Sequence, residues 1–193
     1  MQQEKETRSE ILRKRFSAKR LAVMAVFVAL SYAVSFLEIP LFPATPYLQL
    51  DFGNVFIMLI GFLLGPVEGI VVCVLKECLR MIGGTVVGEI ANICMTSAYV
   101  LLPAIAYRYR KGLKSVGFSL LGACVLASGV ALLVNRFINF PLYEAFLGMP
   151  AGEAFGAVWG LILAFNLIKT VSVSVLTLLL YKRLSNFFKK WKV

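Results

Sequence analysis

The chain has 193 residues, of which 60% are hydrophobic and only 16% charged, and its mean hydropathy is +0.83. Soluble domains are about half apolar and a quarter charged, so this composition excludes a water-soluble globule and predicts an integral membrane protein. A spanning helix needs about 20 apolar residues. Six such helices would use most of the chain and leave no room for a large catalytic domain outside the membrane.

Apolar runs separated by helix-breaking residues predict six spans in chain order. They cover residues 18–37, 52–64, 67–82, 88–107, 116–140 and 154–181. A proline-rich outer loop at 38–51, a Gly65-Pro66 turn and a second outer loop at 141–152 separate several of them, because proline interrupts helices. The prediction is an all-α membrane protein, with residues 17–182 forming a six-transmembrane-helix bundle between a basic segment, 1–16, and a basic tail, 183–193.

Basic residues mark one side of this bundle. Sixteen of the 20 Lys and Arg residues lie at or before Arg20, in the stretch 108–114, or in the stretch 182–192. These stretches flank apolar runs, which is the positive-inside pattern, so both termini are expected to be cytoplasmic. The same residues can contact anionic lipid headgroups. The net charge of +10 is therefore not interpreted as a nucleic-acid surface.

Several kinds of chemistry lack the residues they require. The chain contains no histidine, which excludes histidine-dependent metal sites and Ser-His or Cys-His catalysis. Its four cysteines lie inside apolar runs without CxxC spacing, so neither a disulfide framework nor a metal site is expected. No phosphate-binding glycine loop is present. We expect no enzymatic activity and neither metal nor cofactor.

Polar residues inside the spans are candidates for function, because charge in a bilayer is costly. Lys169 is the only charge in the predicted sixth span, and Asn166 shares its helix face. The pair could donate hydrogen bonds to a ligand, or Lys169 could form an internal salt bridge. Further polar residues fall in the predicted outer half of the bundle: Lys76, Glu77, Arg80, Glu89, Asn92, Asn135, Arg136 and Asn139. They suggest a pocket open to the outside, or alternatively paired residues at the membrane interface.

The first outer loop and the first span each carry a further pattern. The loop residues Tyr47, Leu48, Gln49 and Leu50, followed by Asp51, could cover such a pocket or merely connect two spans. In the first span, small residues recur at four-residue spacing: Ala25, Ala29 and Ala33. Small residues allow another helix to approach closely, either from within the bundle or from a partner.

The chain resembles the substrate-binding S component of energy-coupling factor (ECF) vitamin transporters over about residues 17–182. The resemblance rests on LQLDFGN (48–54), GFLLGPVEG (61–69) with Lys76, GEIAN (88–92), NRFINFPLY (135–143) and NLIK (166–169). It implies a six-helix bundle in a bacterial plasma membrane that binds its vitamin from outside. It also implies a transmembrane coupling protein and two ATPase subunits as partners, with docking through Ala25, Ala29 and Ala33.

Within this family the chain is most similar to the riboflavin-specific member. Riboflavin combines a flat ring system with a polyhydroxyl tail. Tyr47, Leu48 and Leu50 could cover the ring, and Asn135, Asn166 and Lys169 could bond its carbonyls or the tail hydroxyls. The remaining expected ligand contacts are Gln49 and Asn92.

Three alternatives remain open at this stage. The cargo could be another vitamin or precursor, such as folate, pantothenate or a queuosine precursor. The chain could instead be a stand-alone membrane facilitator, which would need a continuous polar path. A structural subunit without a ligand would leave Asn135, Asn166 and Lys169 facing one another with no cavity.

Overall fold

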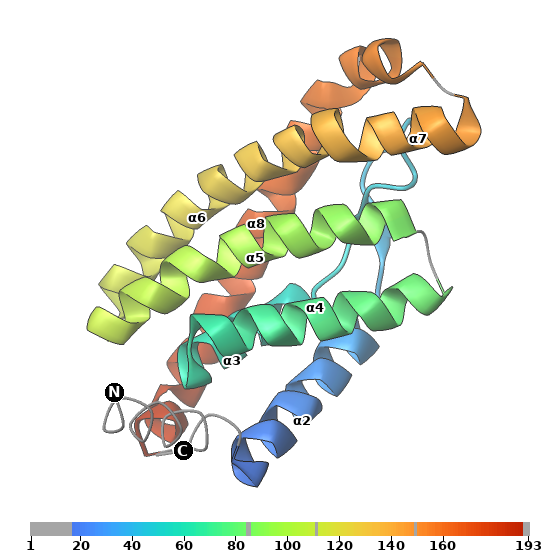
Figure 1. The fold of residues 1–193 in the computed structure, drawn as a ribbon. Coiled ribbons are helices and arrows are strands. Elements are labelled where there is room, and N and C mark those ends of the chain that lie inside the picture. Colours follow the sequence, from blue (N-terminus) through green and yellow to red (C-terminus); the bar gives the residue numbers. More distant parts are fainter. Residues whose placement is uncertain (1–16, 84–85, 111, 149, 191–193) are drawn as a thin grey trace, which may run out of the picture.

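A computed structural model describes residues 17–83, 86–110, 112–148 and 150–190, with the backbone alone at 113 and 184–190. This part of the chain is mostly helical (Figure 1). The helices are α2 (Ala18–Ser35), α3 (Asn54–Leu64), α4 (Pro66–Gly83), α5 (Val86–Tyr109), α6 (Leu113–Val134), α7 (Phe140–Leu147) and α8 (Ala151–Lys190). A π-helical turn, η1 (Asn135–Asn139), joins α6 to α7, and the short strands β1 (Ile39–Pro40) and β2 (Gln49–Leu50) lie between α2 and α3.

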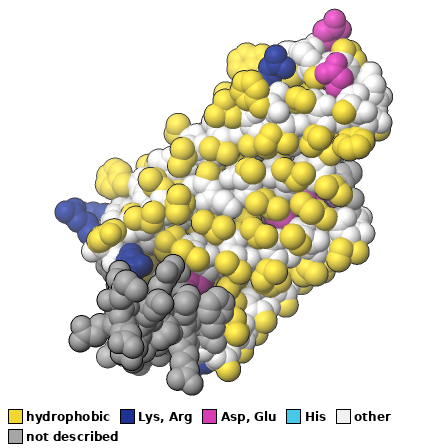
Figure 2. Space-filling model, viewed as in Figure 1, with side chains coloured by type: hydrophobic (Ala, Val, Ile, Leu, Met, Phe, Trp, Pro, Cys, Tyr) yellow, Lys and Arg dark blue, Asp and Glu magenta, His cyan; other side chains and the backbone are white. Residues whose placement is uncertain are grey.

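The outer surface of the bundle is apolar. Within the described residues, four helical segments are long and apolar enough to cross a membrane: Ala18–Ser35, Val86–Tyr109, Lys114–Leu147 and Ala151–Arg183. Helix α3 is apolar but has only 11 residues, and α4 carries four charged residues. Hydrophobic side chains cover most of the face shown in Figure 2, and charged ones gather mainly at its two ends. An apolar lateral surface of this extent is that of a membrane protein.

The first four predicted spans correspond to α2, α3, α4 and α5, and each helix begins and ends within two residues of the prediction. The apolar runs and their Pro and Gly boundaries were sufficient to locate these helices. The sixth predicted span lies inside α8, which begins at Ala151 and continues beyond residue 182, where the basic tail was expected to begin.

The second outer loop was predicted incorrectly. Residues 141–147, expected to be loop, continue the helix as α7, so the connection to α8 is confined to about 148–150. The reason is η1, in which the Phe140 N–H donates to the Asn135 carbonyl five residues back instead of four. Pro141 then occupies the first turn of α7, where its missing N–H does not interrupt the helix. Gly148, with a φ of 68°, ends α7.

Close helix contacts hold the middle of the bundle together. The α3–α4 pair approaches so closely that a Cβ added at Gly69 would lie 3.1 Å from the Gly61 Cα and 2.9 Å from Val100 Cγ1. Near the ends of α3, α5 and α8, the rings of Phe62, Tyr107 and Tyr181 pack with centroids 5.0 to 5.8 Å apart. The bundle is therefore filled by side chains at this level, away from the strands.

The opposite end of the bundle is built differently. Because α3 is short, residues 36–53 run inward from the end of α2 to the first turn of α3. Within this segment β1 and β2 pair antiparallel, with Ile39 opposite Leu50. Its inner end is fixed at Gly53, whose carbonyl accepts from Ser31 Oγ at 2.9 Å and whose N–H donates to Asp51 Oδ1 at 3.0 Å. Figure 1 places this segment at the same end as α7, and the start of α2 and the last turns of α8 at the other end.

Candidate ligand-binding site

A cavity of about 480 Å³ lies between residues 36–53 and helices α4, α5, α6, α7 and α8. Its volume falls within the range typical of small-molecule pockets, roughly 300 to 1,000 Å³. Seven of the eight ligand contacts expected from the sequence line it: Tyr47, Leu48, Gln49, Asn92, Asn135, Asn166 and Lys169. They come from four separate parts of the chain, so the fold has brought distant residues around one space.

The eighth, Leu50, does not line the cavity. Gln49 and Leu50 are neighbours on β2, and successive side chains of a strand point to opposite faces. Gln49 lines the cavity, whereas Leu50 is buried at 7% exposure and pairs through its backbone with Ile39. The apolar cover expected from Leu50 therefore has to come from other residues.

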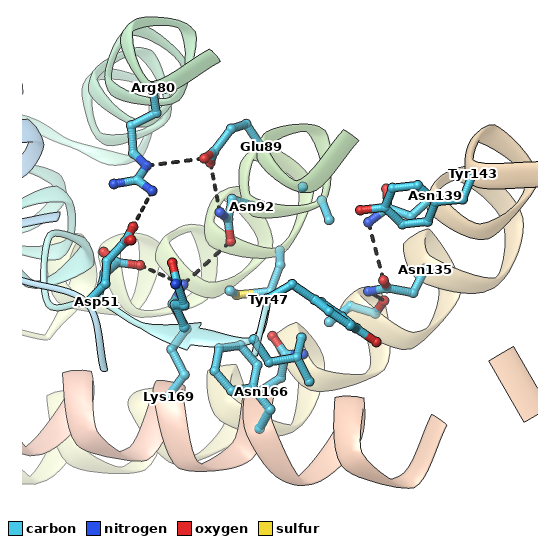
Figure 3. A pocket seen from close by; sticks show the side chains of 18 of the residues that line it. Tyr47, Asp51, Arg80, Glu89, Asn92, Asn135, Asn139, Tyr143, Asn166 and Lys169 are labelled. Atoms are coloured by element: carbon cyan, nitrogen blue, oxygen red, sulfur yellow. Dashed lines mark hydrogen bonds and ion pairs between the residues drawn. The ribbon is translucent and has the colours of Figure 1, made fainter. Parts of the chain in front are cut away.

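Lys169 lies at the polar wall of the cavity and also has an ion-pair partner (Figure 3). Its Nζ is 2.7 Å from Asp51 Oδ2 and 3.5 Å from Asn92 Oδ1. The two interpretations of Lys169, ligand contact and internal salt bridge, are thus compatible. Asp51 holds the ammonium group in place at the edge of the cavity.

Asp51 connects two buried lysines. Besides Lys169, Lys76 Nζ on α4 lies 3.8 Å from Asp51 Oδ1 and 2.9 Å from Glu77 Oε1. Both lysine side chains are at most 2% exposed. Burial alone would raise the pKa of the Asp51 carboxyl, but the adjacent Lys169 and Lys76 ammonium groups and the Gly53 N–H lower it to about 2. Asp51 is accordingly a carboxylate at neutral pH.

Arg80 joins α4 to the segment that covers the cavity. Its Nε donates to Glu89 Oε1 on α5 at 3.1 Å, its Nη1 donates to the Ser35 carbonyl at 3.0 Å, and its Nη2 pairs with Glu38. The side chains of Arg80 and Glu38 are 17% and 25% exposed. A single guanidinium thus connects the end of α2, the start of the 36–53 segment and α5.

Four asparagines supply amide groups, each oriented by an acceptor. Asn92 Nδ2 donates to Glu89 Oε2 at 2.9 Å, which leaves its oxygen facing Lys169. Asn166 Nδ2 donates to the Ile162 carbonyl and Asn135 Nδ2 to the Ala131 carbonyl, both at 2.8 Å. Asn139 Nδ2 donates to Asn135 Oδ1 at 3.2 Å. Carboxylates and carbonyls can only accept, so these contacts fix which way each amide is turned.

The remainder of the wall is apolar or aromatic. Leu48, Met95, Phe140, Tyr143 and Phe165 line it together with Tyr47. A ring of polar groups beside aromatic and aliphatic side chains can bind a small solute that has an apolar plane and several hydrogen-bonding edges. Within the described residues, no group of three or more Cys, Asp or Glu side chains is placed to hold a metal ion.

Some cavity residues were noticed in the sequence but not assigned to the site. Arg80, Glu89 and Asn139 were recognised only as polar residues of the outer half, and Asp51 only as part of a loop. Spacing along one helix showed which of them share a face. It did not show which helices face one another. Phe165 carried no signal, since an aromatic residue in an apolar span looks like any packing residue.

The alanines of α2 lie on its outer side. Ala25, Ala29 and Ala33 are exposed, whereas Met24 and Val28 on the other face are buried against the bundle. The alternative that this stripe packs against the protein's own helices is therefore not what the structure shows. The stripe is available to a partner or to lipid.

Comparisons with known proteins identify the family. The sequence model of one protein family, the ECF transporter substrate-specific component, matches residues 19–181, and the chain belongs to this family. It is 31% identical over 176 residues to the riboflavin transporter RibU of Staphylococcus aureus, covering 89% of this chain and 93% of that one. It is 28% identical over 181 residues to the riboflavin transporter FmnP of Bacillus subtilis, covering 89% and 95%.

The fold agrees with a solved member of the same family. The S component of a bacterial ECF transporter matches with a TM-score of 0.77 and 30% sequence identity, over 89% of this chain and 98% of that chain. The resemblance drawn from the sequence motifs is thereby confirmed. The family consists of transport subunits, so the chain is a substrate-binding membrane component and not an enzyme.

Proposed function

We propose that this chain captures riboflavin from outside the cell as the substrate-binding subunit of an ATP-driven ECF importer. The observation that carries the proposal is the cavity itself, around which oriented amides, a held ammonium group and aromatic side chains are brought together. The tricyclic ring of riboflavin suits the aromatic side chains, and its carbonyls and ribityl hydroxyls suit the amides and the ammonium group. The names of the relatives from Staphylococcus aureus and Bacillus subtilis support the same cargo.

The proposed ligand contacts are those that line the cavity: Tyr47, Leu48, Gln49, Asn92, Asn135, Asn166 and Lys169. Lys169 would donate to a ring carbonyl or to a ribityl hydroxyl, and Asp51 would keep its ammonium group in position. Enclosure beneath residues 36–53 would remove the ligand from water, which strengthens each of these hydrogen bonds.

The proposal includes six membrane crossings with both termini in the cytoplasm of a bacterial cell. The start of α2, the α5–α6 connection and the last turns of α8 lie at one end of the bundle (Figure 1), and exposed Arg108, Arg110 and Lys114 mark that end. The positive-inside rule assigns that end to the cytoplasm, and the cavity then faces outward. Single cysteines introduced at Gly112 and Gly148, in a chain without its native cysteines, would be labelled from inside and outside respectively.

The proposed partners are a transmembrane coupling protein and two ATPase subunits. The exposed stripe of Ala25, Ala29 and Ala33 is where we place the contact with the coupling protein, because small side chains permit close helix approach. ATP hydrolysis by the partners would supply the energy for release inside.

Riboflavin binding to the purified protein tests the proposal. Titration in detergent should quench flavin fluorescence at a one-to-one ratio, and Lys169→Met should weaken binding tenfold or more, about 1.4 kcal/mol. The matched control is Lys114→Met, the same substitution at an exposed position away from the cavity, which should leave the affinity unchanged. No quenching by the wild-type protein would refute riboflavin as cargo, and titration with folate, pantothenate or a queuosine precursor would then follow.

A further inference from the structure

An apolar groove of about 370 Å³ runs along the surface of the bundle between α6 and α8. It shares no lining residue with the cavity described above. On α6 its lining extends from Lys114 to Cys124, and on α8 from Leu178 back to Val171. Of the described residues that line it, Lys114 alone is charged. The groove is therefore a second, separate candidate site, with one cation at one end and hydrophobic walls along the rest.

The polar atoms at the floor of the groove already bond within the protein. Ser174 Oγ lies 2.6 Å from Tyr99 Oη and 3.4 Å from Cys124 Sγ, and the side chains of Ser174 and Cys124 are buried. An occupant with hydrogen-bonding groups along its length would leave them unpaired there, which is costly. The groove therefore suits a hydrocarbon chain.

The length of the groove corresponds to one leaflet of a bilayer. Lys114 and Cys124 are 10 positions apart on α6, and 10 residues of α-helix extend about 15 Å. This is about half of the ~30 Å hydrocarbon core of a bilayer. In the proposed orientation Lys114 lies at the cytoplasmic interface, so the groove covers the depth that one acyl chain of the cytoplasmic leaflet occupies.

Positive charge without a protein partner gathers at the Lys114 end of the groove. Lys114, Arg108 and Arg110 are exposed, and no carboxylate of a described residue lies within ion-pair distance of any of them. Glu68, a carboxylate at the same end of the bundle, already pairs with Arg20. The stem of a lysine can lie along apolar surface while its ammonium group reaches the lipid headgroups. An anionic headgroup would complement this charge.

We propose that the groove binds an anionic phospholipid of the cytoplasmic leaflet, with one acyl chain between α6 and α8 and the headgroup phosphate beside Lys114. Arg108 and Arg110, at the end of α5, add to the attraction for the phosphate. A protein partner is less suited to this surface. The proposed docking stripe lies on α2, which packs against α3 and α4, so the groove does not continue it (Figure 1).

The test measures lipid binding to the full-length protein, purified in detergent and stripped of lipid. Native mass spectrometry counts the lipids bound after addition of phosphatidylglycerol or of phosphatidylcholine with the same acyl chains. Gly117→Leu fills the groove, because Gly117 lines it and a Cβ there would meet no other side chain or helix within 4 Å. The matched control is Gly129→Leu, an equally open position on α6 that does not line the groove. Lys114→Gln removes the cation.

The wild-type protein should bind one phosphatidylglycerol with about fivefold or higher affinity than phosphatidylcholine, as one basic residue near the headgroups provides. Gly117→Leu should weaken binding of both lipids about tenfold or more, since two or more methylene groups lose their place in the groove. Gly129→Leu should bind like the wild type. Lys114→Gln should keep phosphatidylcholine binding and lose the preference for phosphatidylglycerol, and without lipid it should unfold at the wild-type midpoint.

Unchanged lipid binding in Gly117→Leu, or the same loss in Gly129→Leu, would overturn the inference. Equal affinity of the wild-type protein for the two lipids would overturn it as well, because no headgroup would then be recognised. Displacement of the lipid by excess glycerol phosphate, which has no acyl chain, would show that the anion alone is bound and would refute the groove as an acyl-chain site. Loss of assembly with the coupling protein in Gly117→Leu, with lipid binding intact, would assign the groove to a protein partner instead. None of these results depends on riboflavin, so the proposed function is tested separately.

Discussion

Replacing Asp51 by Asn should destabilise the ligand-free protein more than replacing its partner Lys169 by Met. Asp51 is the carboxylate that Lys169 contacts, at 2.7 Å, and the next polar atom is the Asn92 oxygen at 3.5 Å. Loss of the carboxylate charge therefore leaves a buried ammonium group uncompensated. Removing one member of a buried pair costs about 3–5 kcal/mol.

Lys169→Met leaves the Asp51 carboxylate with more partners than Asp51→Asn leaves the Lys169 ammonium group. The carboxylate keeps Lys76 at 3.8 Å and the Gly53 N–H at 3.0 Å. The cost should then be nearer that of one lost charge-assisted hydrogen bond, about 1.5–3 kcal/mol. In the double variant no ammonium group is stranded, because Lys76 retains Glu77 at 2.9 Å. The double variant should therefore be more stable than Asp51→Asn alone.

Thermal unfolding of the ligand-free proteins in one detergent measures this order. For a chain of this size, 3–5 kcal/mol corresponds to a decrease in midpoint of about 6–20 °C for Asp51→Asn. Lys114→Met controls for the loss of a lysine from the surface. If Lys169→Met were the more damaging single change, or if the two effects simply added in the double variant, the pairing argument would be refuted.

Three further predictions concern pH, release and docking. The lowered pKa of Asp51, about 2 against an ordinary 3.8, means that its contribution to stability is complete well above pH 3.8 and is lost as the pH falls toward 2. The difference in thermal unfolding midpoint between wild type and Asp51→Asn should be constant from pH 6 to 8 and should become smaller below pH 4. A change in this difference between pH 6 and 8 would contradict the lowered pKa of Asp51. Arg80→Gln removes the contacts with Glu38 and the Ser35 carbonyl, which attach the covering segment to α4. Riboflavin should then dissociate about tenfold faster in stopped-flow fluorescence, a barrier lowered by ~1.4 kcal/mol. An unchanged dissociation rate would show that Arg80 does not hold the covering segment. Ala29→Leu should weaken co-purification with the coupling protein without altering riboflavin affinity. Ala157→Leu, the control at an exposed position on α8, should change neither. Equal complex formation by the two variants would show that docking occurs at another surface.

The helices could be predicted from the sequence because apolar length and Pro or Gly boundaries are local properties. Helices α2 to α5 followed from them within two residues. Pro141 was misleading for the same reason. Taken alone it indicates the end of a helix, and only the π-helical turn before it shows that it begins the next turn instead.

The site was predictable in its residue types but not in its pairings. Lys169 and Asn166 were evident because polar groups inside an apolar helix are conspicuous. Their surroundings were not, since Asp51 comes from a loop distant in sequence and resembles an ordinary solvated carboxylate until the fold buries it. Gln49 and Leu50 were both expected at the cavity; that Leu50 turns away from it follows from the two-residue strand pairing, which the loop sequence did not signal.

The shortness of α3 also bears on how cargo and protein depend on each other. Eleven helical residues extend roughly 16 Å, about half the hydrocarbon thickness of a bilayer. In the proposed six-crossing arrangement, residues 36–53 and the cavity would occupy the remaining depth, and irregular backbone at such depth is tolerated where it lines a cavity. A vitamin bound in the cavity would then fill volume that a full-length helix would otherwise occupy. While bound, the cargo would be part of the protein's interior, and its release would require the bundle to reopen.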